Sequence, residues 1–374
     1  MAEYLTNTTD LTAVANAIRE KGGTSEQLAC PDGFVSAIQA IQTGAPLQIA
    51  VTTNAGATVT ATKGSKTVSG TADTSGNCTL TVDEAGTWTV TAATASTTKT
   101  SDVVVGISNV DLALVDSVLN NNSWETIKKV SDAGQGENYW SVGDRKAVTL
   151  NGTVGKLSLS NVTTYAFIIG FNHNASIEGA NRIHFQLAKT ALSGGTDVAL
   201  CDSKYTSKVS ATGYFSMNTS YTNSGGWESS QMRRSICGTN LSSYSGTIIA
   251  VIPAALRAVL KSVTKYTDNR GGNTAASTVT ATTDYFFLLS EYEVFGTISR
   301  GNPNESNKQA QYSYYSAGNS KVKYNHSATS TAVSWWLRSP GASYSAYFVI
   351  VRTGGTVDTG GAYYSYGFAP GFCV

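Results

Sequence analysis

The residues of this chain best suited to contact another molecule lie near its C-terminus. Between the strings at 335–340 (WWLRSP) and 367–372 (GFAPGF), tyrosines alternate with serine, alanine and glycine. Antibody binding loops use the same mixture, because tyrosine supplies rigid amphipathic contact area and small residues adapt to the partner. The segment therefore predicts non-covalent recognition.

The residues predicted to make this contact lie where the segment departs from a plain alternating strand. Tyrosine is also a strong strand former, so the tyrosines could instead cover the solvent face of a sheet. Adjacent Tyr363 and Tyr364 cannot share one strand face, however, and Gly360-Gly361 indicates loops. The predicted binding residues, within about 334–366, are Ser334, Ser343, Tyr344, Ala346, Tyr347, Ile350, Arg352, Gly354, Asp358, Gly360, Gly361, Tyr363, Tyr364 and Tyr366.

A few residues could instead do acid–base or metal chemistry. His173 has no second histidine or carboxylate at ligand spacing, and His184 and His326 are also isolated, so we expect structural histidines. Glu291 and Glu293, expected on one side of a strand, could form an acid pair.

The cysteines give no sign of a metal or redox site. Cys30, Cys78, Cys201, Cys237 and Cys373 are odd in number and lack the paired short spacings of such sites. We expect buried thiols.

Composition excludes further classes of function. Charged residues make up 14% of the chain and the net charge is +1, which argues against binding to nucleic acid or to an anionic membrane. No apolar run approaches the roughly 20 residues of a membrane helix, and the first residues lack the pattern of a signal peptide. We expect a protein made soluble inside a cell, without membrane insertion.

The sequence divides into three parts. Residues 1–45 predict two amphipathic helices, the first starting at Thr9 or Asp10 and the second ending before Gly44. Residues 46–107 alternate with period two between turn signals and predict a small β-sandwich. Residues 108–374 mix both patterns, which makes the chain an α+β multidomain protein.

Within the third part, the patterns predict individual elements. Helices are expected over 112–118, from Ser123, and from Pro253 to Val263. Strands are expected over 146–150, 156–159, 165–170, 246–252 and 285–289.

Several strings of the third part resemble one family. They are Asn122–Ile127, Tyr139–Asp144, Ile168–Asn174, Leu288–Gly296 and Trp335–Pro340. They resemble the bacterial and phage domain of C-type-lectin fold whose C-terminal segment, in many members, is diversified by a diversity-generating retroelement. The resemblance covers about 108–374. The string at 86–92 resembles immunoglobulin-like or carboxypeptidase-regulatory-like spacers, and 10–41 resembles segments at the N-termini of phage tail proteins.

The resemblance implies a constant scaffold that presents replaceable side chains. The retroelement mutates adenines of its template, so an Asn codon in the template can never become a codon for Lys, Glu, Gln, Met or Trp. None of these residue types occurs in 339–374, as the resemblance requires. It implies that Glu291 and Glu293 belong to the scaffold, and Arg338, inside an apolar string, is assigned a buried or semi-buried pairing role. The other scaffold residues would be Trp335, Trp336, Leu337, Phe348, Val349, Val351, Phe368 and Phe372. No catalytic residue, metal or cofactor is expected.

Two other functions found on the C-type-lectin fold are less well supported by this sequence. Calcium-dependent sugar binding uses a Glu-Pro-Asn, Gln-Pro-Asp or Trp-Asn-Asp string, and the nearest approach here, Asn302-Pro303-Asn304, lacks a carboxylate. Oxidases of the formylglycine-generating type need two reactive cysteines, and Cys201 and Cys237 lie in a Ser/Thr-rich stretch without basic neighbours tuned to lower a thiol pKa.

The resulting hypothesis is a phage tail adhesin in the virion. Its partners would be a bacterial surface protein or glycan and, through residues 1–45, other tail proteins; a homo-oligomer is possible. The first alternative is a structural tail or decoration protein that uses the C-terminal segment for subunit assembly. The second is the oxidase.

Overall fold

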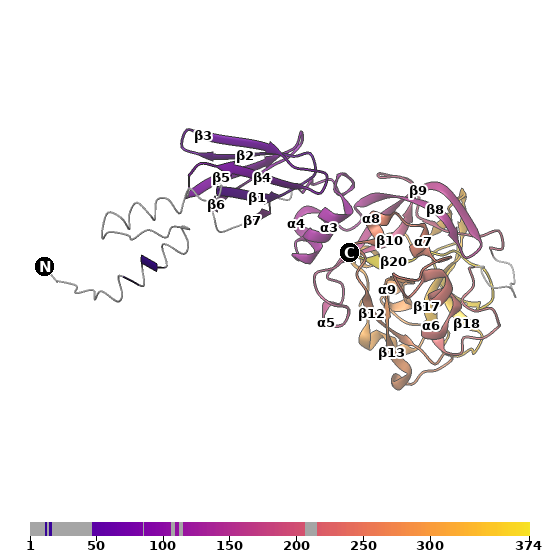
Figure 1. Cartoon of the computed structure of the whole chain (residues 1–374). Helices are drawn as coiled ribbons and strands as arrows, with labels where there is room; N and C mark the ends of the chain where they lie inside the picture. The colour runs from indigo at the N-terminus through magenta and orange to yellow at the C-terminus, as the bar shows by residue number, and fades with distance from the viewer. Residues whose placement is uncertain are drawn as a thin grey trace. The chain divides into compact units, whose positions relative to one another are not determined.

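The computed structural model of the protein describes residues 12, 15, 16, 47–84, 86–105, 109–111, 115–205 and 215–374. The two helices predicted within 1–45 lie almost entirely outside the described residues, as do Cys30 and residues 206–214. The chain forms two compact units, Met1–Leu114 and Val115–Val374, which are described separately (Figure 1). No helix among the described residues has the length and apolar character needed to cross a membrane.

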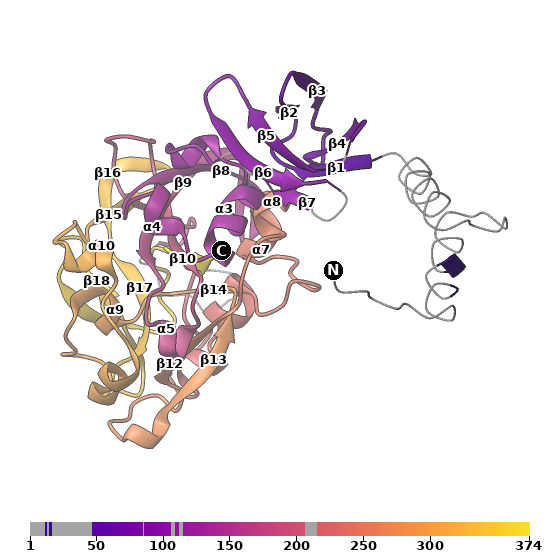
Figure 2. The ribbon, with the colours of Figure 1, turned by 90° about the vertical axis from the view of Figure 1, so that its left-hand side faces the viewer.

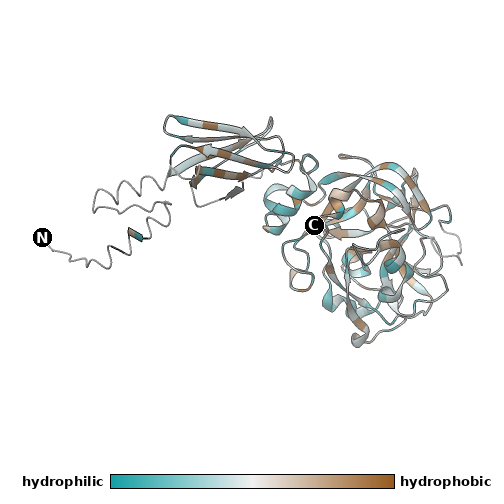
Figure 3. Ribbon diagram, in the orientation of Figure 1, coloured by the Kyte–Doolittle hydropathy of each residue, from teal (hydrophilic) through white to brown (hydrophobic). Residues whose placement is uncertain are grey.

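Among the described residues, the first unit contains one mixed and one antiparallel sheet, which share one core. The strands are β1 (Leu47–Thr52), β2 (Thr58–Lys63), β3 (Lys66–Thr71), β4 (Asn77–Val82), β5 (Thr87–Ala93), β6 (Thr98–Val104) and β7 (Asn109–Asp111). One sheet has the order β4-β1-β7, with β7 parallel to β1, and the other has the order β3-β2-β5-β6. Hydrophobic segments recur along these strands (Figure 3), and alternate residues of β4 and β5 are buried.

The boundary between the units lies a few residues beyond the predicted one at 107/108. The reason is β7, which pairs with β1 in the register Ala50↔Asn109 and so extends the first unit. A helix was predicted over 112–118. The structure describes residues 115–118 of this range, and they do not lie in a helix. A 3₁₀ turn, η1 (Leu119–Asn121), follows instead.

The second unit contains four small sheets and mostly short helices. A five-stranded sheet has the order β14-β20-β10-β9-β8, and a β17-β18-β19 sheet, a β11-β15-β16 sheet and a β12-β13 hairpin complete the set. Figure 2 shows β12 and β13 side by side. The strands are β8 (Arg145–Val154), β9 (Leu157–Phe171), β10 (Ile183–Lys189), β11 (Val198–Ala199), β12 (Val263–Asp268), β13 (Val279–Asp284), β14 (Phe286–Phe287), β15 (Lys323–Asn325), β16 (Ala328–Val333), β17 (Trp335–Pro340), β18 (Tyr347–Val351), β19 (Val357–Gly361) and β20 (Gly371–Cys373).

Helices connect these strands. They are α3 (Trp124–Asp132), α4 (Gly136–Tyr139), α5 (Ala175–Glu178), α6 (Gly226–Ser229), the π-helix η2 (Met232–Cys237), α7 (Ile248–Val251), α8 (Ala254–Arg257), η3 (Ala276–Thr278), α9 (Glu291–Phe295), η4 (Pro303–Lys308) and α10 (Ser313–Ser316). Helix α3 starts as predicted, with the Ser123 hydroxyl accepting a hydrogen bond from the Thr126 amide. Its Trp124, Ile127 and Val130 are buried.

Three predicted elements are wrong in type or extent. The apolar run 246–252 forms the buried helix α7 rather than a strand, because a short apolar run fits either element. Helix α8 ends at Arg257, and Val263 already begins β12. The strand predicted over 285–289 is reduced to the two residues of β14.

The C-terminus is built into the core of the second unit. The Val374 carbonyl accepts hydrogen bonds from the Ile183 amide at 3.0 Å and from the Ser131 hydroxyl at 2.5 Å. Strand β20 lies between β10 and β14, so the last residues complete the five-stranded sheet. Figure 1 shows β20 beside β10. The tyrosine-rich segment is thus anchored on both sides, by β17 before it and β20 after it.

Candidate functional site

Six tyrosines of the second unit form a continuous series of ring contacts, here called the tyrosine cluster, and Tyr205 meets its inner end at Tyr366, with ring centroids 6.4 Å apart. Ring centroids are 5.4 Å apart for Tyr344–Tyr347, 5.4 Å for Tyr347–Tyr221 and 4.6 Å for Tyr221–Tyr363. The series continues through Tyr363–Tyr364 at 5.0 Å and Tyr364–Tyr366 at 5.9 Å. Most pairs meet edge-on or tilted, the arrangements that aromatic rings prefer.

The cluster runs from the surface into the core. Tyr344 is 54% exposed and Tyr221 is 46% exposed, whereas Tyr366 is half-buried and packs against Trp336 at 4.8 Å. The remaining cluster members, Tyr347, Tyr363 and Tyr364, are also half-buried. Each thus presents part of a phenol to solvent while its neighbours hold it in place.

Tyr221 was not among the predicted binding residues, although it occupies the middle of the cluster. Its hydroxyl donates a hydrogen bond to the Tyr347 hydroxyl. This hydrogen bond, together with partial desolvation, raises the pKa of Tyr221 to about 12. The only sequence signal was the excess of aromatic residues in the Ser/Thr-rich stretch 201–245, which did not distinguish a surface residue from a core residue.

Gly360 and Gly361 are buried, so their prediction as surface contacts is corrected. A Cβ atom at Gly360 would lie 2.4 Å from Tyr366 Cε2, and one at Gly361 would lie 2.5 Å from Tyr221 Cε2. The two glycines of β19 form a floor on which the tyrosine rings rest. They support the cluster by having no side chain, rather than by touching a ligand.

Ile350 is also buried, at 4% exposure, which corrects its prediction as a surface residue. The reason is that residues 348–351 of β18 are buried on both faces, so strand alternation does not bring Ile350 to the surface. Its partner across the strands is Asp358.

The predicted residues Arg352, Gly354 and Asp358 lie at the opposite end of the β18–β19 hairpin from Tyr347. The Arg352 guanidinium pairs with Asp358, and Arg300 Nη2 lies 3.8 Å from the same carboxylate. Gly354 is exposed in the turn. This charged end is close enough to the tyrosine cluster for Arg352 and Asp358 to act electrostatically on Tyr366.

The other predicted residues lie in the loop between β17 and β18 and directly before β17. Ser343 is exposed, and Ala346 is half-buried with its carbonyl accepting a hydrogen bond from the Ala362 amide at 2.9 Å. The half-buried Ser334 donates its amide to the Tyr205 hydroxyl at 2.8 Å.

Asn223 holds the loop between β17 and β18, and sequence reasoning missed it. Its side-chain amide donates to the carbonyls of Tyr344 at 2.7 Å and Tyr347 at 2.9 Å, and to a third, that of Gly341, at 3.2 Å. Its backbone amide donates to the Ser345 carbonyl at 2.7 Å. With 1% exposure, this residue fixes the loop from below.

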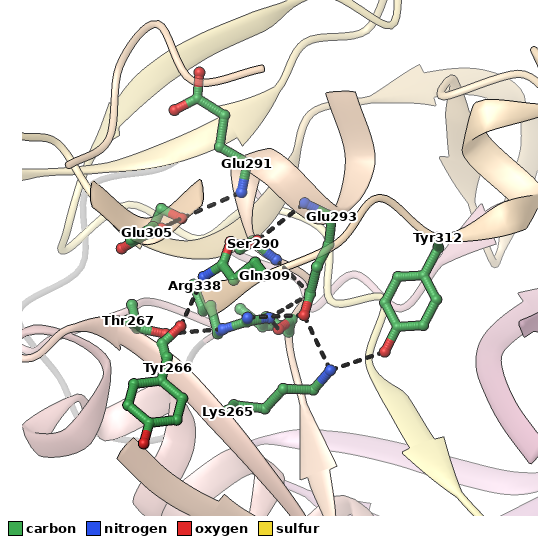
Figure 4. Close-up of polar contacts among 12 residues, drawn as sticks. Lys265, Tyr266, Thr267, Ser290, Glu291, Glu293, Glu305, Gln309, Tyr312 and Arg338 are labelled. Carbon is green, nitrogen blue, oxygen red and sulfur yellow. Dashed lines mark hydrogen bonds and ion pairs between the residues drawn. The ribbon is translucent and has the colours of Figure 1, made fainter. Parts of the chain in front are cut away.

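Beneath this surface lies a fully buried ion network centred on Glu293. Arg338 of β17 contacts both carboxylate oxygens of Glu293, and its Nη2 lies 2.8 Å from Oε1 (Figure 4). The Arg338 Nε donates to the Thr267 hydroxyl at 2.8 Å, and its Nη1 to the Leu288 carbonyl at 2.8 Å. The buried pairing role assigned to Arg338 is confirmed.

Glu293 also caps its own helix. The Ser290 hydroxyl accepts from the Glu293 amide at 3.1 Å, and Glu293 Oε2 accepts from the Ser290 amide at 2.9 Å, which is a capping box at the start of α9. Glu291 and Glu293 therefore lie on a helix, not on the strand expected. Glu291 accepts the amides of Ser299 at 2.7 Å and Gly301 at 2.7 Å. Both carboxylates are saturated with structural hydrogen bonds.

Lys265 carries the network across to α5. Its ammonium donates to Glu293 Oε1 at 2.9 Å and to the Tyr312 hydroxyl at 2.9 Å (Figure 4). It also donates to Glu178 Oε2 at 2.6 Å. Burial alone would raise the pKa of Glu293, but the charges of Arg338 and Lys265 outweigh it and hold that pKa below its ordinary value.

His173 and His184 are not isolated, contrary to the sequence analysis. Their rings lie 5.5 Å apart, and His173 Nε2 lies 3.7 Å from Glu178 Oε1. Burial, reinforced by the charge of Lys265, lowers the pKa of His173 to about 3, and burial raises the pKa of Glu178 to about 7. The histidine is therefore neutral at neutral pH.

His173, Glu178 and Glu293 bring ligand atoms within 4.8 Å of one another, a spacing that could hold a metal ion. Lys265 already bonds to both carboxylates, and Arg338 neutralises Glu293 further. A dication would have to displace an ammonium and lie beside a guanidinium. The arrangement fits a charge-balanced support better than a metal centre.

The described cysteines, Cys78, Cys201, Cys237 and Cys373, are free and buried. Burial raises the pKa of Cys201 to about 12 and that of Cys237 well above its ordinary value. Both thiols stay protonated at neutral pH, which is the opposite of what a reactive pair requires.

Comparison with known families gives one finding. A family model described as "Domain of unknown function (DUF6273)" matches residues 202–374, which is less than half of the chain. The matched stretch contains the whole tyrosine cluster together with Lys265, Glu293 and Arg338, whereas His173, His184 and Glu178 lie before it. A search of curated proteins gives no match.

Proposed function

We propose that this protein is a non-enzymatic ligand-binding protein that contacts its partner through the tyrosine cluster. The observation that carries the proposal is the combination of six mutually packed phenols with graded exposure, from 54% at Tyr344 to the half-buried Tyr366. Rigid tyrosines with an apolar body and a hydroxyl tip are enriched at binding hot spots. The ring contacts hold the side chains in place before a partner arrives, which lowers the entropic cost of binding.

The second part of the proposal concerns the kind of protein. The strings that resemble the retroelement-diversified family support a C-type-lectin-type domain whose exposed side chains are replaceable. The two-sheet first unit supports an immunoglobulin-like spacer, and residues 1–45 would attach the chain to other tail proteins. The partner would be a bacterial surface protein or a glycan, and the carrier a phage tail.

Diversification is consistent with which residues of the segment are exposed. Ser343, Tyr344 and Tyr363 can change without losing core packing, because each is at least partly exposed, whereas Tyr364 packs against the core. The buried Ile350, Gly360 and Gly361 belong to the constant support in this proposal. A template repeat next to the gene should carry Asn codons at the exposed positions, and a repeat that differs from the gene at bases other than adenine would contradict diversification.

Binding itself is tested with purified protein on a panel of bacterial cells. We expect Tyr344→Ala and Tyr363→Ala each to weaken binding by about tenfold or more, which corresponds to about 1.4 kcal/mol. Tyr139→Ala is the matched control, since Tyr139 is 39% exposed and lies outside the cluster. Unchanged binding by both cluster variants would refute the proposal. Loss of particle assembly with binding intact would favour the structural tail protein instead.

A further inference from the structure

Two buried lysines flank one aspartate across three neighbouring strands. Lys189 is the last residue of β10 and forms a bridge with Asp197, which directly precedes β11. Lys323 is the first residue of β15, which runs parallel to β11 in the register Val198↔Tyr324. Asp197 and Lys323 are therefore neighbours in adjacent strands, and the Tyr324 amide donates to the Asp197 carbonyl at 2.8 Å.

The two amines differ in their contacts. The Lys189 ammonium contacts Asp197 Oδ1 and donates to the Tyr314 hydroxyl at 2.9 Å. Tyr314 in turn donates to Asp197 Oδ2 at 3.3 Å. The Lys323 Nζ, fully buried, has no hydrogen-bond partner among the described residues and lies 3.9 Å from Asp197 Oδ2.

The surroundings of Lys323 are aromatic. Its Nζ lies 5.1 Å from the ring centroid of Trp335 and 5.4 Å from that of Phe167. Two ammonium groups beside one carboxylate would leave a net positive charge in this apolar site. Burial lowers the pKa of Lys323 to about 8, so a neutral amine with a free lone pair is accessible near neutral pH.

We propose that Lys323 and Asp197 join in an intramolecular amide cross-link between β15 and β11. The neutral Lys323 Nζ attacks the carboxylate carbon of Asp197, and the Tyr314 hydroxyl stabilises the oxygen that gains negative charge. Oxygen Oδ1 leaves as water, taking one proton from the Lys323 amine and one from the Lys189 ammonium. The products are one amide, one water and a neutral Lys189, so atoms and charges balance without an added reagent.

Several features of the site favour this step over a simple ion pair. Adjacent strands hold the amine and the carboxylate side by side, which raises their effective concentration. The apolar walls favour the neutral amide over separated charges. Lys189 supplies the proton and Tyr314 the oxyanion contact. The link would close the chain between residues 197 and 323 and so reduce the entropy of the unfolded state.

The test is the intact mass of the purified full-length chain. We expect a mass lower by one water than the sequence requires, after allowance for loss of Met1, and a branched peptide joining Lys323 to Asp197 on digestion. Lys323→Met and Asp197→Ala should each restore the full mass. Lys146→Met is the control, because that buried lysine donates to backbone carbonyls elsewhere and should leave the water loss intact.

The wild-type protein alone decides the question, even if a variant fails to fold. A wild-type mass equal to that of the sequence, after incubation of the folded chain at a pH near the pKa of Lys323, would overturn the proposal. A branched peptide that contains Lys189 in place of Lys323 would also overturn it. This inference does not depend on ligand binding by the tyrosine cluster, so either proposal can fail without the other.

Discussion

The tyrosine cluster and the ion network around Glu293 are held in place by opposite means. The cluster rings contact one another at the surface and rest on two glycines. In the network, Arg338, Lys265 and Glu293 are all fully buried and satisfy one another's charges. A side chain in surface packing of this kind can be replaced at little cost in stability. Removing the partner of a buried charge strongly destabilises the fold. The division suits a protein that keeps its support constant while its surface changes.

The largest expected effect is loss of the buried ion pair. Arg338→Met leaves Glu293 with only part of its counter-charge, and we expect a loss of about 3–5 kcal/mol in the free energy of unfolding. Chemical denaturation of the second unit measures it. Arg352→Met is the matched control, because Arg352 is exposed and its pair with Asp358 should contribute about 0–1 kcal/mol. Equal losses of unfolding free energy in the two variants would contradict the claim that the buried network is less tolerant of change than the surface.

The second effect is a pH dependence that the cluster should not share. The pKa of His173 is about 3 in the folded state against an ordinary value of 6.5, so the unfolded chain binds more protons between these values. The stabilisation is complete above pH 6.5 and is lost as the pH falls towards 3, with a slope of at most about 1.4 kcal/mol per pH unit. His173→Gln should flatten the plot of melting temperature against pH in this window. An unchanged plot would show that His173 is protonated in the folded protein.

The third effect concerns Gly360, which lies against the tyrosine cluster on its buried side. Gly360→Ala places a Cβ 2.4 Å from Tyr366 Cε2, and we expect overpacking to cost about 1–3 kcal/mol and to weaken binding. At Gly354 nothing lies within 4 Å of a Cβ, so Gly354→Ala serves as the control. Thermal melting and the cell-binding assay report both consequences. If Gly360→Ala melts like the control, the floor is not needed.

The fourth effect on stability concerns the loop that carries Tyr344. Asn223→Ala removes the donor to three backbone carbonyls, and we expect a loss of about 1–3 kcal/mol. Asn319→Ala, which removes one bond at an exposed residue, should cost less. Faster amide hydrogen exchange around residues 341–347 would confirm local loosening. Exchange that rises equally throughout the second unit would point to a global role instead.

The sequence predicted local structure correctly where the type of one residue, or a simple alternation of residue types, determines the structure formed. The Ser123 cap of α3, the period-two strands of the first unit and the buried pairing of Arg338 are examples. The helix α7 was missed because residues 248–252 are apolar throughout, so their periodicity carries no information.

The site could be predicted only in part, because its members come from distant parts of the chain. Tyr221 and Asn223 reach the segment from more than 100 positions away, as the contacts Tyr221–Tyr347 and Asn223–Tyr344 show. His173 looked isolated because Glu178, although only five residues further on, is not at ligand spacing, and Lys265 reaches Glu178 only in the fold. Local spacing reports on one element, whereas burial on both faces of β18 depends on neighbouring layers.

The most direct test of the central claim combines the two most exposed members of the cluster. The double variant Tyr221→Ala/Tyr344→Ala should keep a melting temperature close to that of the wild type, since both rings are largely exposed. Its affinity for bacterial cells, measured on the same sample, should fall by at least about a hundredfold, or roughly 2.7 kcal/mol. Wild-type affinity in this folded variant would contradict the claim that the tyrosine cluster is the contact surface.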